Sequence, residues 1–151
     1  MTQPSSDLPQ LLKTLNPQLN EGVYVFCCLC KDDKIPDVPI VGQFRESEET
    51  TLILSEADAL KTGLKILFRF AWITLTVHSD LTAIGLTAAI SAALTEDKIS
   101  CNIVAGAHHD HLFVPIDQAD AALISLRRVQ ESAAQGLASS KIKKRTHSNR
   151  S

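Results

Sequence analysis

The sequence lacks most features that would assign a function outright. It contains no run of about 18 apolar residues, so no membrane-spanning helix is expected. It has no glycine-rich phosphate loop, no nucleophile elbow, and no serine or cysteine beside a base at a recognised spacing. We therefore expect a non-enzyme without a cofactor. The opening segment, MTQPSSDLPQ, lacks the basic-then-apolar order of a signal peptide, which predicts a cytoplasmic location.

The composition suits an ordinary globular protein. The chain has 151 residues, of which 44% are hydrophobic and 21% are charged, enough for one compact domain or two small packed subdomains. Five basic residues follow the last acidic one, Glu131: Lys141, Lys143, Lys144, Arg145 and Arg150. Subtracting these five charges from the net charge of −2 leaves −7 for the rest. A body this acidic disfavours binding of nucleic acid through the folded surface.

The four cysteines give no metal or disulfide pattern. Cys27, Cys28 and Cys30 fall within one predicted strand, and Cys101 stands alone. On a strand, Cys28 and Cys30 point to one side and Cys27 to the other. We interpret them as reduced thiols that pack as small apolar groups.

Residues 71–115 carry the clearest secondary-structure pattern. Ile73, Leu75 and Val77 alternate with polar or aromatic residues, which predicts a strand with one buried face. A polar turn follows, and then a helical apolar stripe formed by Leu86, Ala89, Ile90, Ala93 and Leu94. Two further strands are predicted around residues 99–103 and 112–114. This β-α-β-β order predicts an α+β fold with helices on one face of a small sheet.

The remaining segments extend this pattern in both directions. We predict a helix over 7–15, strands over 23–30, 41–45 and 51–54, a helix over 55–63, strand structure over 66–77, and a helix over 117–131. Pro17 ends the first helix, and Ser55 and Gly63 are cap signals at the two ends of the second. Residues 31–39, with two prolines, are predicted to form an exposed loop. Residues 66–77 are either one long strand or two strands meeting near Arg69. The two halves of the chain then have similar element orders. The first lacks an opening strand and the second a closing one, so the halves complete each other or pair with another copy.

Several segments in this order resemble a known family. The first half reads LNPQLNEGVYVF, VGQFRE and TLIL, and the second reads WITLTVHS, GLTAA, ISCNIVAG and HDHLFVP. Residues 7–131 resemble stand-alone proteins with two ACT domains in tandem, and more loosely the regulatory ACT pair of aspartate kinases. The resemblance implies ferredoxin-like βαββαβ units with antiparallel sheets, over residues 1–66 and 67–132. Residues 133–151 are then expected to form a disordered basic tail.

The resemblance also implies a ligand site, because ACT domains commonly bind amino acids between two modules. The corresponding residues here are His78, Ser79, Asp80, Leu81, Ile84, Gly85, Asn102, Ile103 and Val104. A helix N-terminus attracts a carboxylate, and Asp80 could accept hydrogen bonds from a ligand ammonium group. The structural alternative is that Ser79 or Asp80 only caps the turn and Gly85 relieves backbone strain. The proline that often precedes the glycine in ACT turns is absent here, since Ile84 takes its place.

Three histidines near residue 110 form a second polar cluster. His108, His109 and His111 surround Asp110, and imidazoles with a carboxylate can bind zinc or nickel. His109 and His111 would share one face of a strand. No other cysteine or histidine has convincing ligand spacing, so we favour a hairpin whose histidines are solvated or contact Asp110.

The leading hypothesis is a regulatory homodimer that senses an amino acid and acts on an enzyme or another protein. One alternative is an interaction module without a metabolite, which would pair through a sheet edge or the face of Trp72. The other is a metal-binding protein that uses the cluster at His108–His111.

Overall fold

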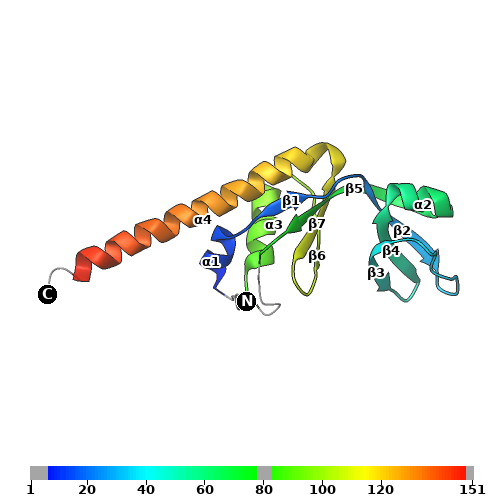
Figure 1. Ribbon diagram of the computed structural model, residues 1–151, viewed down its shortest axis with the longest axis horizontal. Helices are drawn as coiled ribbons and strands as arrows, with labels where there is room; N and C mark the ends of the chain where they lie inside the picture. Colours follow the sequence, from blue (N-terminus) through cyan, green and yellow to red (C-terminus); the bar gives the residue numbers. More distant parts are fainter. Residues whose placement is uncertain (1–6, 78–82, 149–151) are drawn as a thin grey trace.

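The computed structural model describes residues 7–77 and 83–148, with side chains up to residue 136. The elements in chain order are α1 (Leu8–Lys13), β1 (Pro17–Leu19), β2 (Tyr24–Cys30), β3 (Ile40–Arg45), β4 (Glu49–Ser55), α2 (Glu56–Thr62), β5 (Lys65–Leu75), α3 (Leu86–Glu96), β6 (Asn102–Ala105), β7 (Asp110–Pro115), a 3₁₀ turn (Ile116–Gln118) and α4 (Ala119–Ser148) (Figure 1). Within the described part of the chain, no helix has the length and apolar character needed to cross a membrane.

The strand β5 joins the two halves of the molecule into one antiparallel sheet. The strand order is β3-β4-β2-β5-β7-β6, and β1 also pairs with β5. The first part of β5 pairs with β2, and its second part lies between β1 and β7. Residues 65–75 therefore form one long strand, which decides between the two alternatives left open for this segment. The predicted domain boundary, between residues 66 and 67, falls inside this shared strand.

Each half of the sheet has the strand order of a ferredoxin-like unit. The first unit is β3-β4-β2-β5 and the second is β6-β7-β5-β1. The second unit lacks a closing strand in sequence, as expected, and β1 supplies it from the N-terminal region of the same chain. The expectation for the first unit was wrong: β2 is its opening strand, and the missing element is a helix, because residues 31–39 form a loop between β2 and β3.

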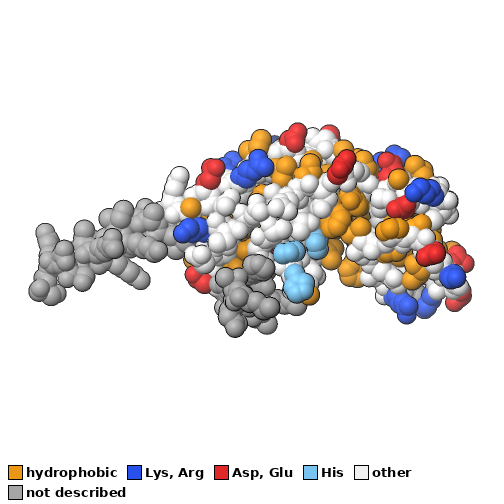
Figure 2. All heavy atoms as spheres, in the orientation of Figure 1, with side chains coloured by type: hydrophobic (Ala, Val, Ile, Leu, Met, Phe, Trp, Pro, Cys, Tyr) orange, Lys and Arg blue, Asp and Glu red, His pale blue; other side chains and the backbone are white. Residues whose placement is uncertain are grey.

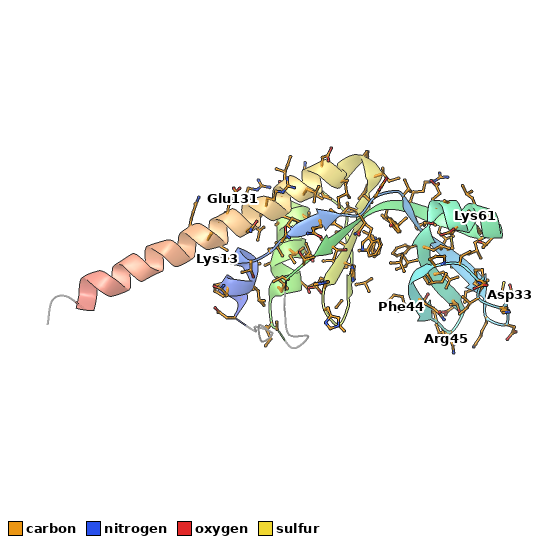
Figure 3. The ribbon with its side chains drawn as sticks, viewed as in Figure 1. Lys13, Asp33, Phe44, Arg45, Lys61 and Glu131 are labelled. Atoms are coloured by element: carbon orange, nitrogen blue, oxygen red, sulfur yellow. The ribbon has the colours of Figure 1, made fainter. Side chains whose placement is uncertain are left out.

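The N-terminal helix α1 belongs structurally to the second unit. It packs against α4, and the side-chain amide of Gln130 donates a hydrogen bond to the carbonyl oxygen of Lys13 (3.3 Å). Figure 3 shows Lys13 and Glu131 on these two neighbouring helices. Sequence analysis missed β1 because a three-residue strand has no periodicity and Pro17 was taken only as a helix stop.

The helices α1 to α4 all cover the same face of the sheet. Under α1, α3 and α4, the core contains the predicted strand residues Ile73, Leu75 and Val77, together with Ile90 and Leu126. A smaller core under α2 contains Val25, Cys27, Leu52, Leu54 and Ala59. The burial predicted for the alternating residues Ile73, Leu75 and Val77 is thus confirmed.

On the opposite face of the sheet the described part of the chain places no helix, and this face carries every aromatic residue of the chain. These seven residues are Tyr24, Phe26, Phe44, Phe68, Phe70, Trp72 and Phe113. Several of the rings pack on one another, with Phe26 contacting Phe70 (centroids 5.1 Å apart) and Phe113 (5.3 Å). Phe113 is buried without a covering helix, but Phe68 remains 65% exposed. In Figure 2, hydrophobic side chains gather over the middle of the molecule.

Helix ends follow the predicted signals at α2 and depart from them at α4. The Ser55 hydroxyl accepts a hydrogen bond from the Asp58 amide, and Gly63 ends α2 in the left-handed conformation, as predicted. The prediction of disorder after residue 132 was wrong, because α4 continues to Ser148 and projects from the body (Figure 1). This segment contains no proline and many good helix formers, which favour continuation even without an apolar stripe.

Candidate functional site

The turn predicted to hold a ligand lies partly outside the described residues. His78, Ser79, Asp80 and Leu81 fall in that part, so the site rests on the residues around it. Ile84 is 88% exposed. Gly85 is the N-cap residue of α3, with φ of 97°.

Backbone conformation and side-chain packing both explain the glycine at position 85. A positive φ of this size strains any residue with a Cβ. A Cβ at Gly85 would also lie 2.9 Å from Cδ2 of Leu8, on α1. The interpretation that Gly85 relieves backbone strain therefore has direct support. In addition, the N-terminal helix packs closely against this position.

The strand half of the predicted site forms an edge of the sheet. Asn102, Ile103 and Val104 are the first residues of β6, which pairs with β7 alone among the described strands. The Ile103 side chain packs into the core beneath the helices, whereas Val104 packs with the aromatic face. Because β7 lies between β5 and β6, these residues are at least about 10 Å from the end of β5. The end of β5 and Asn102 are therefore not in direct contact.

The histidine cluster forms part of the β6–β7 hairpin. Asp110 is only 8% exposed, and its burial raises the pKa of the carboxyl group, against the opposing effects of His111 and His109. Among the described residues, no group of three His, Cys, Asp or Glu side chains could hold a metal ion. His108, at the tip of the hairpin, is exposed.

His111 has a specific structural partner on the aromatic face. The indole Nε1 of Trp72 donates a hydrogen bond to Nδ1 of His111 (3.1 Å), which requires that Nδ1 carry no proton. Burial lowers the pKa of His111, and nearby His109 lowers it further, while Asp110 opposes them. No local sequence pattern indicates this contact, because it joins residues 39 positions apart.

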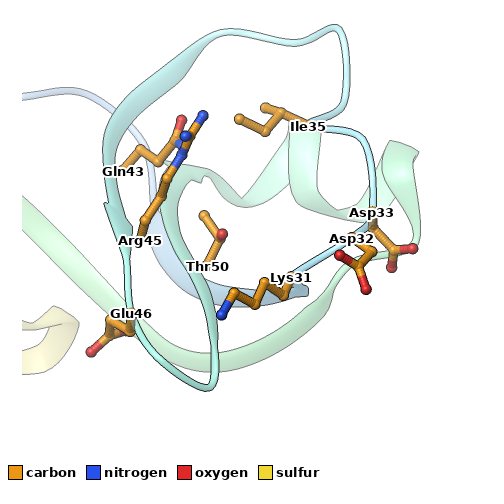
Figure 4. Close-up of a pocket in the computed structure, with 8 residues that line it drawn as sticks. All are labelled: Lys31, Asp32, Asp33, Ile35, Gln43, Arg45, Glu46 and Thr50. Atoms are coloured by element: carbon orange, nitrogen blue, oxygen red, sulfur yellow. The ribbon is translucent and has the colours of Figure 1, made fainter.

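A charged cavity that sequence analysis missed lies in the first unit. Its volume is about 370 Å³, and it is lined by Lys31, Asp32, Asp33, Ile35, Gln43, Arg45, Glu46 and Thr50 (Figure 4). Figure 4 shows Arg45 and Gln43 on one wall, with Ile35 reaching toward them from the other side. The cations can bind a carboxylate and the acidic side chains can bind an ammonium group. The loop at residues 31–39 was predicted only as an exposed connection.

This cavity and the predicted turn occupy equivalent places in the two units. The loop lining the cavity follows β2, the first strand of the first unit, and the predicted turn follows β5, the first strand of the second. Each unit therefore has candidate ligand-binding residues immediately after its opening strand.

Comparison with known proteins identifies the two units. ACT-domain family models match residues 4–71 and residues 68–128. A structure from Vibrio cholerae, described as a protein of unknown function and possible transport protein, is 40% identical with a TM-score of 0.72. The match covers 82% of this chain and 95% of that one. The chain belongs to the ACT-domain family.

More distant structures share the tandem ACT fold. Protein Atu0741 from Agrobacterium tumefaciens is 14% identical, with a TM-score of 0.61, over 77% of this chain and 89% of its own. The regulatory subunit of aspartate kinase from Thermus flavus is 12% identical, with a TM-score of 0.54, over 75% and 95%. No curated protein matches the chain. ACT domains are regulatory modules, and the ferredoxin-like fold predicted from sequence is confirmed.

Proposed function

We propose that this ACT-domain protein is a non-catalytic sensor that binds a small metabolite of the amino-acid class in the cytoplasm. The observation that best supports the proposal is the tandem arrangement, since the two ACT matches together extend over residues 4–128. We expect the signal to pass through association with another protein, such as a regulated enzyme. A ligand shifts such an association by its difference in affinity for the two states.

The proposed ligand site in the second unit requires two copies of the chain. The turn at residues 78–85 of one copy would meet the β6 edge, Asn102–Val104, of the other. The free edge of β6 supports this arrangement, because an unpaired strand edge offers backbone groups for pairing. A homodimer of this kind would bring the two parts of the proposed site together.

The charged cavity of the first unit is a second candidate for the same ligand class. An amino acid carries one carboxylate and one ammonium group, and the cavity has side chains of both signs. Arg45 is the best candidate for the carboxylate, because it lies beside Gln43 and its planar guanidinium suits bidentate binding.

A thermal-shift screen of the twenty amino acids, with and without EDTA, tests the function. A ligand at a hundredfold excess over its Kd should raise Tm by about 5 °C or more. Selective stabilisation by one amino acid or a small group supports a sensor. A loss of stability in EDTA would instead indicate a metal-binding protein. No response to any amino acid would favour an interaction module.

Single prolines in β6 test the dimer by sedimentation velocity. Successive amides of an edge strand point alternately inward and outward, so Ile103→Pro and Val104→Pro remove one amide of each kind. One variant should keep the fold and become monomeric, while the other should lose stability. A wild-type chain that sediments as a monomer at all concentrations would contradict the dimer.

A further inference from the structure

A second cavity lies on the helix-free face of the sheet, where the two ACT units meet. It has a volume of about 550 Å³ and is lined by Phe26, Phe68, Arg69, Phe70, Ser100, Asn102 and Pro115. Its position follows from the strand pairing. The strand β7 ends at Pro115, opposite Phe70, so residues 65–69 of β5 have no described strand on that side. The cavity occupies the space beside this unpaired segment.

The apolar wall of the cavity is made of aromatic rings. Phe26 and Phe70 pack against each other at 5.1 Å, and the Phe68 ring lies 6.1 Å from that of Phe70. The first two rings are held by the sheet and by Phe113, but Phe68 is 65% exposed. A flat ring in the cavity could stack on these faces and cover Phe68.

The polar groups of the cavity are all able to donate hydrogen bonds. Ser100 contributes a hydroxyl, Asn102 an amide and Arg69 a guanidinium, and none of the described acidic residues lines the cavity. The Nε of Arg69 pairs with Glu56 on α2, which leaves the terminal guanidinium nitrogens for other acceptors. The unpaired backbone of β5 adds further polar groups at the rim.

We propose that this cavity binds a small, flat, ring-bearing molecule whose polar end carries hydrogen-bond acceptors, such as a carboxylate or sulfonate. The rings stack on Phe26, Phe68 and Phe70, and the acceptors face Asn102 and Ser100. The cavity volume is within the range of small-molecule sites, which are mostly apolar with a few placed polar groups. The site lies on the opposite face of the sheet from the cavity at Arg45. It shares Asn102 with the proposed β6 contact, but its aromatic wall of Phe26, Phe68 and Phe70 takes no part in the proposed function.

Fluorescence titration of the full-length protein with 8-anilinonaphthalene-1-sulfonate tests the site. The dye has two ring systems and a sulfonate. We expect one saturable site, and an affinity reduced by about tenfold or more in Phe68→Ala, because one stacking face is lost. Phe44→Ala is the matched control: Phe44 is 49% exposed on the same sheet face but does not line the cavity, and its loss should leave the affinity within about twofold.

Comparison with a dye that lacks the sulfonate tests whether the cavity binds hydrogen-bond acceptors. N-phenyl-1-naphthylamine has the same rings without the sulfonate, so it should bind about tenfold more weakly than the sulfonated dye. Asn102→Leu should remove most of that difference. Equal affinity of the two dyes for the wild-type protein would overturn the assignment of the polar end.

Two outcomes would overturn the site as a whole. One is a dye affinity that Phe68→Ala and Phe44→Ala change equally, which indicates general binding to the apolar face. The other is a dimer that dissociates in Phe68→Ala without any saturable dye binding to the wild type, which makes the face a contact between copies. Circular dichroism and Tm of each variant establish that it is folded.

Discussion

At the scale of single residues, Gly85 is the point where the start of α3 packs against the N-terminal helix α1. Its positive φ opens α3, and the Leu8 side chain fills the space where a side chain would otherwise begin. Sequence analysis singled out this glycine through the family resemblance but could not see its contact with Leu8. That contact depends on where α1 packs, which no local pattern encodes.

The substitution Gly85→Ala should destabilise the protein by about 1–2 kcal/mol, because it forces a Cβ into a left-handed backbone conformation. Urea unfolding measures this change. The matched control is Gly136→Ala, an exposed glycine within α4 with no atom near its Cβ position, which should stabilise by about 0.5–1 kcal/mol. A neutral Gly85→Ala would contradict the strained conformation.

The hydrogen bond between Trp72 and His111 predicts a pH-dependent change in the aromatic face. Folding lowers the pKa of His111 below the unfolded value of 6.5. As pH falls below 6.5, the unfolded chain therefore binds a proton at His111 more readily than the folded chain does. The contribution of His111 to stability is therefore present at neutral pH and is lost as pH falls from about 6.5 through the folded pKa. Protonation at Nδ1 would also break the contact with the indole.

Trp72 is the one tryptophan of the chain, so its fluorescence reports this transition. Between pH 7 and pH 5 the emission should change in the wild type and change much less in His111→Asn, which keeps an acceptor but does not titrate. His108→Asn should behave like the wild type, because this exposed ring lies outside the contact. Identical profiles for all three proteins would argue against the assignment.

At the scale of elements, local sequence patterns predicted where strands and helices occur better than they predicted which strands pair. Alternation identified the buried face of β5, and the Ser55 and Gly63 signals located α2. The continuity of β5, in contrast, is decided by its pairing with both β2 and β7. The short strand β1 pairs with β5 at three positions, and only folding brings these two segments together.

Helix α4 combines a packed part and a projecting part. Ala119, Ala122 and Leu126 are buried against the second unit. A chain ending at Gly136 keeps these contacts, so its Tm should lie within about 2 °C of the full-length value. Differential scanning calorimetry makes this measurement.

The control for this truncation is a chain ending at Ile124. It loses the fully buried Leu126 side chain, which should cost about 2–5 kcal/mol by comparison with large-to-small core substitutions. If ending the chain at Gly136 were as damaging as ending it at Ile124, the projecting part of α4 would have a structural role that its position does not suggest.

At the scale of the whole molecule, two ACT units share one strand, and the two faces of their common sheet differ in composition. The helices all lie on one face, and the aromatic residues all lie on the other. Composition predicted the acidic body, and the family resemblance predicted the paired units. Neither could predict that the units share β5 or that all seven aromatic side chains converge on the uncovered face, because both follow from strand register.

The proposed sensor function is tested most directly by a thermal-shift screen of amino acids on four proteins: wild type, Asp80→Ala, Arg45→Ala and the surface control Lys13→Ala. We expect one amino acid, or a chemically related few, to raise Tm of the wild type and of Lys13→Ala by about 5 °C or more at saturating concentration. One of the other two variants should lose that response and so identify the unit that binds. Stabilisation by no amino acid, or an equal response in all four proteins, would contradict the account.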